Sequence, residues 1–357
     1  MKIWFRYNSR NSYSIAALIP LVDADLVLQP RAGIMLYSFA TPQAGEVYQE
    51  VDSARKAKLD AVFVAGGPHP SAMPEEVLEH FDFVAIGEGE ETLPELIRAI
   101  TDGRDPRMVK GIAYKSQGLI CFTEKRAPVN LDLYPPFTRI LAPIEISRGC
   151  PWGCTYCQTP RLFGRCMRHR SIPVVARYAR RHKDIRSTSP NSLAYGSDGR
   201  RPRLEKVRAL LEELSEQKKP IYFGTFPSEV RPDFVSDEAL EIITQHCANK
   251  TISLGGQSGS PVVLKSIRRG HGRQEIESAC EHILDHGLVP QVDLIFGLPM
   301  ESAEDQQLTL DLARWIEGKG GKVRAHRFMP LPGTPLWDKK PAPLSSDAEA
   351  LLGSLAQ

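Results

Sequence analysis

The sequence predicts an α/β protein in two parts, an N-terminal doubly wound, Rossmann-like sheet and a C-terminal partial (β/α)6 barrel. Short apolar runs alternate with helical stretches along the chain, which is typical of parallel strands joined by crossover helices. A Pro-rich segment without periodicity, residues 126–139, separates two series of such units. The chain of 357 residues is 42% hydrophobic and 25% charged, so two hydrophobic cores are expected.

The first series occupies residues 1–102 and predicts a small doubly wound sheet. Its expected strands are residues 2–7, 34–39, 61–67 and 83–88, and its expected helices are residues 12–22, 43–57 and 90–100. Two further strand-like runs within residues 111–123 flank Ser116, Gln117 and Gly118 and predict a β-hairpin. We therefore expect residues 103–140 to form this hairpin and a linker.

The second series, residues 141–335, repeats strand and helix six times. Its expected strands are residues 143–150, 192–198, 220–230, 251–259, 289–299 and 322–333. Ser302 and Asp305 predict a capping box, and Gly287 is expected to end the helix before the fifth strand. Six units predict an incomplete barrel, with its chemistry at the carboxyl ends of the strands. Residues 336–357 are expected to form a C-terminal tail or helix.

Charge and composition exclude several classes of protein. The net charge of +2 gives no global attraction to nucleic acid or membranes, and no run of about eighteen apolar residues is present. The first residues, MKIWFRYNSR, do not resemble a signal peptide. The seven cysteines then indicate free thiols or metal ligands in a reducing compartment, and we expect a cytoplasmic protein.

A basic run at residues 161–186 lacks interleaved aromatic residues, so we interpret it as a solvated helix face with a few anion contacts. Arg168 and Arg170 are its candidates for facing an anionic group. The histidines at 69, 246, 271 and 326 fit no metal-binding spacing and are expected to be surface or structural residues.

The segment RGCPWGCTYCQ, residues 148–158, carries the most specific chemical signal. Cys150, Cys154 and Cys157 can present three sulfurs to three corners of an iron–sulfur cube, leaving one iron open. An open position invites a substrate or cofactor to bind metal. A zinc site completed by Cys166 or His169 and a ferredoxin cluster are the alternatives, and the spacing fits neither template. The remaining cysteines, Cys121, Cys166, Cys247 and Cys280, are expected to be small buried hydrophobes.

This C-x3-C-x2-C pattern, with Tyr156 before the last cysteine, resembles the radical S-adenosylmethionine superfamily. The resemblance implies a four-iron four-sulfur cluster (4Fe-4S) on the three cysteines, whose open iron is chelated by the amino and carboxylate groups of S-adenosylmethionine. It also implies that one electron from the cluster cleaves the sulfonium and yields a 5′-deoxyadenosyl radical.

Motifs at the expected strand ends extend this resemblance to S-adenosylmethionine contacts. AYGSDGR occupies the place of a second-strand motif that meets the methionyl amino group, and GGQSGS that of a fourth-strand segment near the ribose. DLIFGLP is similar to the fifth-strand G-x-I-x-G-x-x-E motif near adenine, with Glu301 displaced by one place. The implied contacts are Tyr156, Asp198, Gly199, Glu229, Gln257, Arg268, Arg269, Ile295 and Gly297. Outside the cysteine loop, each motif taken alone is equally compatible with an ordinary loop or barrel residue.

The first hundred residues resemble the cobalamin-binding domain of cobalamin-dependent radical enzymes, through YSFAT, VAGGPHP and AIGEGEE. Ser38 and Thr41 could hydrogen-bond a buried dimethylbenzimidazole tail, and Gly66 and Gly67 would let the backbone approach it. Contacts from the third motif would come from Glu88 and Gly89. The cobalt-binding D-x-H-x-x-G motif is absent, since RYNSRNSYS contains no His. We therefore expect cobalamin without a protein His ligand; the alternative is a relic domain that binds none.

The leading function is a cobalamin-dependent radical methyltransferase, similar to a group of short archaeal and bacterial members. One alternative is a methylthiotransferase-like enzyme without cobalamin, although no cysteine precedes Cys121 to hold its second cluster. The other is a non-catalytic cobalamin or redox sensor. The expected partners are an unknown small-molecule or peptide substrate and an electron donor such as flavodoxin or ferredoxin. No catalytic acid or base is assigned.

Overall fold

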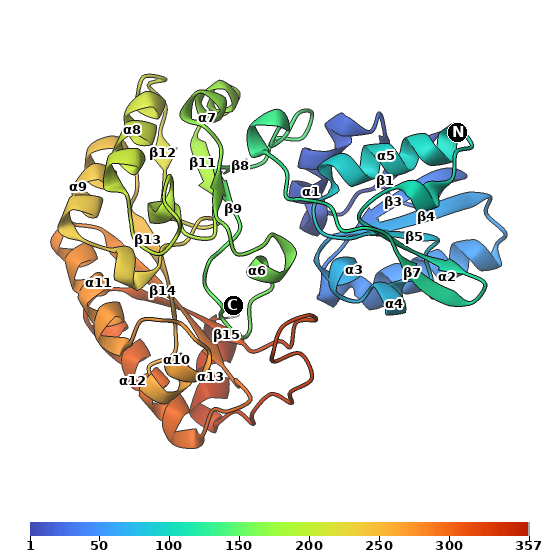
Figure 1. The fold of residues 1–357 in the computed structure, drawn as a ribbon. Helices are drawn as coiled ribbons and strands as arrows, with labels where there is room; N and C mark the ends of the chain where they lie inside the picture. The colour runs from blue at the N-terminus through green and yellow to red at the C-terminus, as the bar shows by residue number, and fades with distance from the viewer. Residues whose placement is uncertain (356–357) are drawn as a thin grey trace. The chain divides into compact units, whose positions relative to one another are not determined.

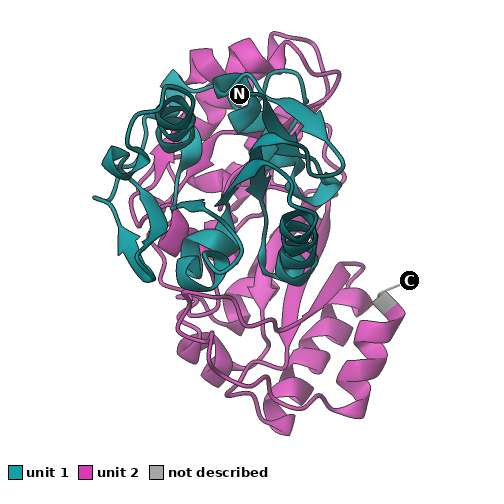
Figure 2. Cartoon of the chain, turned by 90° about the vertical axis from the view of Figure 1, so that its right-hand side faces the viewer, with its two compact units in different colours: residues 1–142 teal, residues 143–357 magenta. Residues whose placement is uncertain are grey.

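A computed structural model describes residues 1–355 as two compact units, residues 1–142 and the chain from Pro143 onward (Figures 1 and 2). Both units have α/β architecture, as the alternating pattern predicts. In the part of the chain that is described, no helix is both long and apolar enough to span a bilayer.

The first unit contains one seven-stranded sheet in the order β2-β1-β3-β4-β5-β6-β7. Its strands are β1 (Ile3–Arg6), β2 (Asp25–Val27), β3 (Gly33–Ser38), β4 (Ala61–Gly66), β5 (Phe83–Ala85), β6 (Ile112–Ser116) and β7 (Leu119–Phe122). β1 to β5 are parallel, whereas β6 and β7 are antiparallel. The four expected strands and the hairpin are present, and the hairpin extends the sheet. The short edge strand β2 was not expected.

Helices cover both faces of this sheet (Figure 1). They are α1 (Ser12–Leu18), α2 (Ala44–Lys56), α3 (Pro68–Ala72), α4 (Pro74–Val77) and α5 (Gly89–Thr101). Ile34 and Leu36 of β3 pack with α1 and α5, while Met35 and Tyr37 pack with α2 and α4. Successive residues of a strand point to opposite faces, so burial on both faces explains why β3 is a continuous apolar run.

The second unit is a partial barrel. Its strands are β8 (Ile144–Glu145), β9 (Ser147–Arg148), β10 (Arg168–His169), β11 (Ile185–Thr188), β12 (Ile221–Tyr222), β13 (Thr251–Gln257), β14 (Val289–Phe296) and β15 (Lys322–Arg327). Two parallel sheets, β12-β11-β8 and β13-β14-β15, supply its six strands, and the Val230–Leu254 bridge connects them. β9 and β10 form a separate antiparallel pair beside the cysteine loop.

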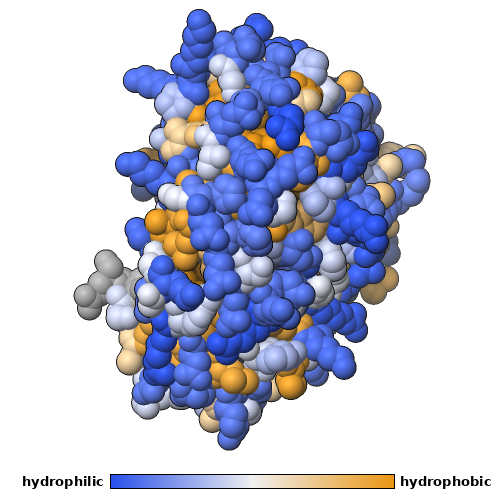
Figure 3. Space-filling view, turned by 90° about the vertical axis from the view of Figure 1, so that its left-hand side faces the viewer, coloured by the Kyte–Doolittle hydropathy of each residue, from blue (hydrophilic) through white to orange (hydrophobic). Residues whose placement is uncertain are grey.

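The helices of the second unit follow its strands. They are α6 (Thr159–Leu162), α7 (Ile172–Ala179), α8 (Leu204–Ser215), α9 (Asp237–His246), α10 (Pro261–Ser266), α11 (Arg273–Asp285), α12 (Ala303–Gly318) and α13 (Ser346–Leu355). The Ser302–Asp305 capping box is confirmed, and Gly287 adopts a positive φ of 72° after α11. The face drawn in Figure 3 is mostly hydrophilic with separate small hydrophobic patches, since the apolar sides of the helices face inward.

One expected barrel strand is wrong. Residues 192–198 are not a strand: Ser192–Ala194 form a 3-10 helix, and Gly196 has a positive φ of 75°. The second strand is β11, which overlaps the end of the basic run and alternates buried and half-buried residues. β11 was missed because its sequence, IRST, is mostly polar. Residues 192–198 were predicted as a strand because Leu193 and Ala194 are apolar.

The expected burial of the scattered cysteines is only partly correct. Cys280 is buried, but Cys121 and Cys247 are half-buried and Cys166 is exposed. Cys166 lies on the segment that returns to the cysteine loop, where its carbonyl packs against Gly149.

Candidate active site

A cavity of about 440 Å³ in the second unit lies at the carboxyl ends of the barrel strands. Cys150, Cys154 and Cys157 all line it, and none of them forms a disulfide. Tight backbone contacts shape their loop. Gly149 has a φ of 88°, and a side chain there would collide with the carbonyl of Cys166. The Cys150 amide donates to the Gly164 carbonyl at 3.1 Å, which fixes where the loop begins.

The three thiols suit a cluster better than a single ion. Within residues 1–355, no three His, Cys, Asp or Glu side chains converge on one point as ligands of one metal ion do. Each thiolate of a four-iron cluster binds a different iron, so its ligands are spread more widely. The fourth ligands that a zinc site would need are unsuitable. Cys166 is exposed, and His169 already bonds Ser147 Oγ at 2.8 Å and the Ser197 carbonyl at 2.7 Å.

Burial raises the pKa of the Cys150 and Cys157 thiols in this structure. For Cys157, hydrogen bonds from Thr159 oppose that rise, and for Cys150 the Trp152 amide and then the charge of Arg231 do so. The buried thiols therefore need positive charge nearby to become thiolates, whether that charge comes from iron or from arginine.

Two buried arginines stand beside the cysteines. Arg269, 8% exposed, has its Nη1 3.7 Å from Cys154 Sγ and 3.3 Å from Tyr156 Oη, and its Nη2 donates to the Gly255 carbonyl at 2.5 Å. Arg231 lies 3.7 Å from the centre of the Trp152 ring and donates to the Arg269 carbonyl at 2.8 Å. Its Nη1 is buried without a hydrogen-bond partner in the described chain. The same guanidinium forms an ion pair with Asp233 at 3.0 Å through Nε and Nη2, so Nη1 is the nitrogen left for an anionic ligand.

His271 supports Arg269 as a neutral residue. Burial, reinforced by the charges of Arg269 and Arg231, lowers the pKa of His271 to about 3. Its Nε2 can therefore accept the hydrogen bond from Arg269 Nε, which measures 3.1 Å. The imidazole thus orients the guanidinium without adding another positive charge.

Another part of the cavity wall combines two carboxyl groups, on β14 and on the segment between β12 and β13, with basic side chains of β15. Asp293 binds Arg324 through both carboxylate oxygens, each at 2.6 Å, and His326 Nε2 lies 3.2 Å from Oδ1. Glu229 meets the same guanidinium only at 3.5 Å. Burial opposes the ionisation of Asp293, but His326 and Arg324 outweigh it and lower its pKa. Burial and the neighbouring Asp293 raise the pKa of Glu229 to about 7. Glu229 is therefore the carboxyl group of this wall that can exchange a proton near neutrality.

The structure brings some of the expected S-adenosylmethionine contacts together and separates others. Those that line the cavity are Tyr156, Gly199, Glu229, Gln257 and Ile295, together with Arg269. Asp198 is exposed and accepts the Arg200 amide at 2.9 Å, while Arg268 is exposed at a positive φ of 57°. The Gly297 amide donates to Glu301 at 2.5 Å instead of facing the cavity.

Several polar residues of the cavity wall were missed by sequence reasoning, and three of them carry the charge contacts described above. Arg231, Asp293 and His326 all line the cavity. Arg231 and Asp293 belong to FPSEVRP and DLIFGLP, segments that the sequence had already marked, so charged residues beside a marked position were the available signal. His326 lies near the end of β15, where its carboxyl-end position could have suggested it.

In the first unit, the residues expected to contact the cobalamin tail lie together at the carboxyl ends of β3 and β4. Ser38 is the register partner of Gly66. Gly67 has a φ of 99°, and an added Cβ there would lie 2.9 Å from Ser38 Oγ and 3.0 Å from the Phe39 amide. Thr41 Oγ1 is 3.2 Å from His69 Nδ1. The glycine turn is thus a tight backbone cradle that a side chain would fill.

The loop after β1 offers no imidazole. Asn11, buried there, donates to the Ser38 carbonyl at 2.9 Å and the Arg6 carbonyl at 3.2 Å, and it forms a capping box with Asn8. These contacts tie the loop after β1 to the carboxyl end of β3. Glu88 accepts the Val129 amide at 2.8 Å and anchors the linker, and Gly89 packs closely on Leu18.

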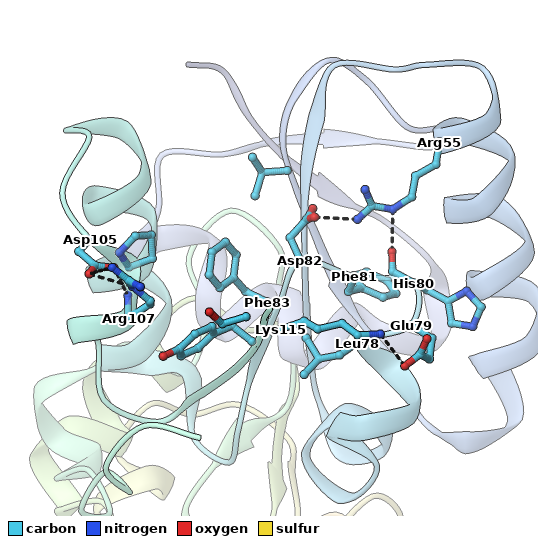
Figure 4. Close-up of a pocket in the computed structure, with 14 residues that line it drawn as sticks. Arg55, Leu78, Glu79, His80, Phe81, Asp82, Phe83, Asp105, Arg107 and Lys115 are labelled. Carbon is cyan, nitrogen blue, oxygen red and sulfur yellow. Dashed lines mark hydrogen bonds and ion pairs between the residues drawn. The ribbon is translucent and has the colours of Figure 1, made fainter. Parts of the chain in front are cut away.

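A second cavity, about 710 Å³, lies in the first unit at the amino ends of β4 and β5 (Figure 4). Its charged residues are paired with one another, Arg55 with Asp82 at 2.9 Å, Lys115 with Glu79 at 2.9 Å, and Arg107 with Asp105 at 2.7 Å. This cavity lies at the opposite edge of the sheet from the glycine turn. Ligands of doubly wound sheets bind at the carboxyl ends of the strands, so a ligand is expected at the glycine turn and not in this cavity.

Comparison with known families agrees with both sites. Residues 144–313 match the radical SAM superfamily, and residues 21–97 match the B12 binding domain. These matches identify a radical SAM domain over residues 144–313 and a B12-binding domain over residues 21–97. The first domain implies a 4Fe-4S cluster and S-adenosylmethionine, and the second implies cobalamin.

The chain is also similar to particular known proteins. The chain is 26% identical over 305 residues to bacteriochlorophyllide d C-12(1)-methyltransferase of Chlorobaculum tepidum, which covers 84% of this chain and 64% of that protein. It thus spans less than two thirds of this relative's length. Its fold is similar to the radical S-adenosylmethionine methyltransferase TsrM from Kitasatospora setae, solved with cobalamin and a [4Fe-4S] cluster (TM-score 0.72, 15% identity, 94% of this chain and 74% of TsrM). It is also similar to OxsB, a cobalamin-dependent S-adenosylmethionine radical enzyme (TM-score 0.68, 17% identity, 99% and 55%).

Proposed function

We propose that this protein is a cobalamin-dependent radical SAM enzyme that reductively cleaves S-adenosylmethionine and methylates an unactivated carbon of its substrate. The observation that carries the proposal is the convergence of three free cysteines and two buried arginines on one cavity at the carboxyl ends of the barrel strands. The bound cofactors supply the chemistry, a carbon-centred radical from S-adenosylmethionine and a transferable methyl group from cobalamin.

The residues of the second unit would bind the cluster, orient S-adenosylmethionine and shield the radical from water. Cys150, Cys154 and Cys157 would hold the cluster, and the unpaired Nη1 of Arg231, supported by Arg269, would receive a carboxylate. Glu229, with its pKa near 7, can donate or accept a hydrogen bond to a hydroxyl group. Buried neighbours of these groups keep water away from a reactive radical.

The first unit would hold the nucleotide tail of cobalamin at its glycine turn. Gly67 allows the backbone approach, and Ser38 offers a hydroxyl beside it. Asn11 closes the end of β1 without providing a metal ligand. Glu88 and Gly89, proposed from sequence as further contacts, instead support the linker and α1, so their contribution would be indirect.

The test is anaerobic reconstitution with iron and sulfide, followed by S-adenosylmethionine and a strong reductant. We expect 5′-deoxyadenosine even without substrate, because the open iron allows uncoupled cleavage. Binding of S-adenosylmethionine without cleavage would contradict the enzyme hypothesis and favour a cobalamin or redox sensor. About four irons per chain separates this proposal from a two-cluster methylthiotransferase, which would hold about eight. We also propose a cytoplasmic location, since free thiols persist in a reducing compartment.

A further inference from the structure

We propose that four exposed arginines around the cysteine loop form a docking surface for an acidic one-electron carrier protein, of the flavodoxin or ferredoxin kind. We call Arg161, Arg165, Arg200 and Arg201 the arginine rim. The inference rests on the proposed function, because it concerns how the electron for cleavage reaches the cluster site.

The charge distribution along the chain is the first observation. Residues 147–203 contain thirteen Arg and Lys against two Asp, although the whole chain has 45 basic and 43 acidic residues. The remainder of the chain is therefore acidic by nine charges, and the positive excess is concentrated on the segments that hold and flank the cysteines. Such a local field steers oppositely charged partners without attracting them to the whole surface.

The geometry places the rim on the outside of the cysteine loop. A side chain at Gly153 would collide with the guanidinium of Arg165, so this guanidinium lies directly against the backbone between Cys150 and Cys154. Only the backbone of the cysteine loop would therefore separate the cysteine sulfurs from a partner protein bound to Arg165.

Arg200 and Arg201 are held beside the same loop by the preceding residue. Trp152 Nε1 donates to the Gly199 carbonyl at 2.9 Å, and a Cβ at Gly199 would lie 2.8 Å from Pro151. The two arginines therefore follow directly from a segment packed on the cysteine loop. Arg161 lies on α6, four residues after Cys157.

The rim is not used for internal ion pairs. All four side chains are exposed, and none has an acidic partner among residues 1–355. Other arginines of the same segments are paired, Arg148 with Glu145 at 2.7 Å and Arg203 with Glu205 at 2.9 Å. Exposed unpaired guanidinium groups retain their full capacity for carboxylates of another molecule.

An acidic protein fits this surface better than RNA does. No aromatic side chain of residues 159–186 or 196–203 is exposed, whereas single-stranded RNA is bound mainly by stacking on aromatic residues. The position beside the metal-binding loop also matches electron delivery. The step is balanced: the reduced carrier loses one electron, for example from flavin hydroquinone to semiquinone, and the oxidised cluster gains it.

The experiment uses the reconstituted full chain and a purified acidic flavodoxin in its reduced form. The rate of cluster reduction is followed by bleaching of its visible absorption in a stopped-flow instrument. For Arg200→Glu/Arg201→Glu we expect the second-order rate constant to fall at least about tenfold at low ionic strength. This difference should shrink at about 1 M salt, where the screening length is about 3 Å.

Two controls make the result specific. Lys250→Glu/Lys322→Glu carries the same charge change at the amino ends of β13 and β15, on exposed residues without an ion-pair partner in the described chain, and should reduce at the wild-type rate. Reduction by photoreduced 5-deazariboflavin, a small reductant, should be equal in all variants with equal iron content.

Equal flavodoxin rates in the rim variant and wild type would overturn the inference while leaving the proposed function intact. Loss of bulk tRNA binding in the rim variant, with unchanged flavodoxin rates, would identify the surface as an RNA site instead. Failure of the wild-type chain to assemble a cluster would overturn the proposed function, and this inference with it.

Discussion

Gly66 and Gly67 are adjacent in sequence, but the structure predicts opposite responses to alanine. Gly67 has a φ of 99° and a ψ of −173°, a conformation that is essentially restricted to glycine. Holding alanine there costs about 1–3 kcal/mol. Its Cβ would also lie 2.9–3.0 Å from Ser38 Oγ and the backbone of Phe39, and such overpacking adds about 1–3 kcal/mol. We expect Gly67→Ala to lose about 2–6 kcal/mol of unfolding free energy, the sum of these two contributions.

Gly66→Ala is the matched control. A Cβ at Gly66 finds no atom closer than 3.8 Å, and the residue continues β4 in extended backbone. Alanine there should be neutral or stabilise by up to about 1 kcal/mol, through loss of freedom in the unfolded chain. Urea unfolding of the apoprotein, followed by circular dichroism, measures both variants. Equal midpoints for the two alanine variants would refute the strained turn and the cradle derived from it.

Three further predictions follow from the two sites. Replacing Cys150, Cys154 or Cys157 by Ala should abolish cluster absorbance and iron retention, whereas Cys166→Ala should leave iron content unchanged; loss of iron in that last variant would contradict the three-ligand assignment. Burial raises the pKa of Glu301 to about 7, above its ordinary 4.5. The folded state therefore binds more protons between these values, and stability should fall by up to about 3 kcal/mol as pH rises through that window. Glu301→Gln should flatten this dependence in urea unfolding at pH 5 and 8. Mixed anaerobically with hydroxocobalamin and desalted, the protein should retain a corrinoid whose paramagnetic spectrum lacks coupling to a protein nitrogen, and Gly66→Val should lower its occupancy.

The sequence pattern predicted strands best where burial on both faces made them continuously apolar. β3 and β4 were found for this reason, and their carboxyl ends carry the expected Ser38 and Gly66 side by side. β2 was missed because it has three residues at an edge and exposes two of them. β11 was missed because half of its side chains are polar and partly solvated.

The candidate site shows a similar limit. The cysteine spacing is local, so it could be interpreted without knowing the fold. The choice between Arg268 and Arg269 depends instead on one backbone angle. The positive φ of Arg268 reverses the chain after α10, which leaves Arg268 exposed and buries Arg269 beside Cys154. The carboxylate of Asp198 accepts the Arg200 amide and so closes its own turn, which the sequence pattern did not indicate.

The incomplete ring of strands has a consequence for the size of the substrate. β8 and β15 belong to separate sheets, so the first and last barrel strands are not joined by a backbone ladder. A side-chain hydrogen bond, from Gln158 Nε2 to the Pro332 carbonyl at 2.9 Å, crosses between the loops that follow them. Such a bond contributes only about 1 kcal/mol, so thermal motion can part the two loops. Because the same cavity of about 440 Å³ would also hold the cluster and S-adenosylmethionine, a large substrate could insert only its reacting carbon and leave its bulk in solvent.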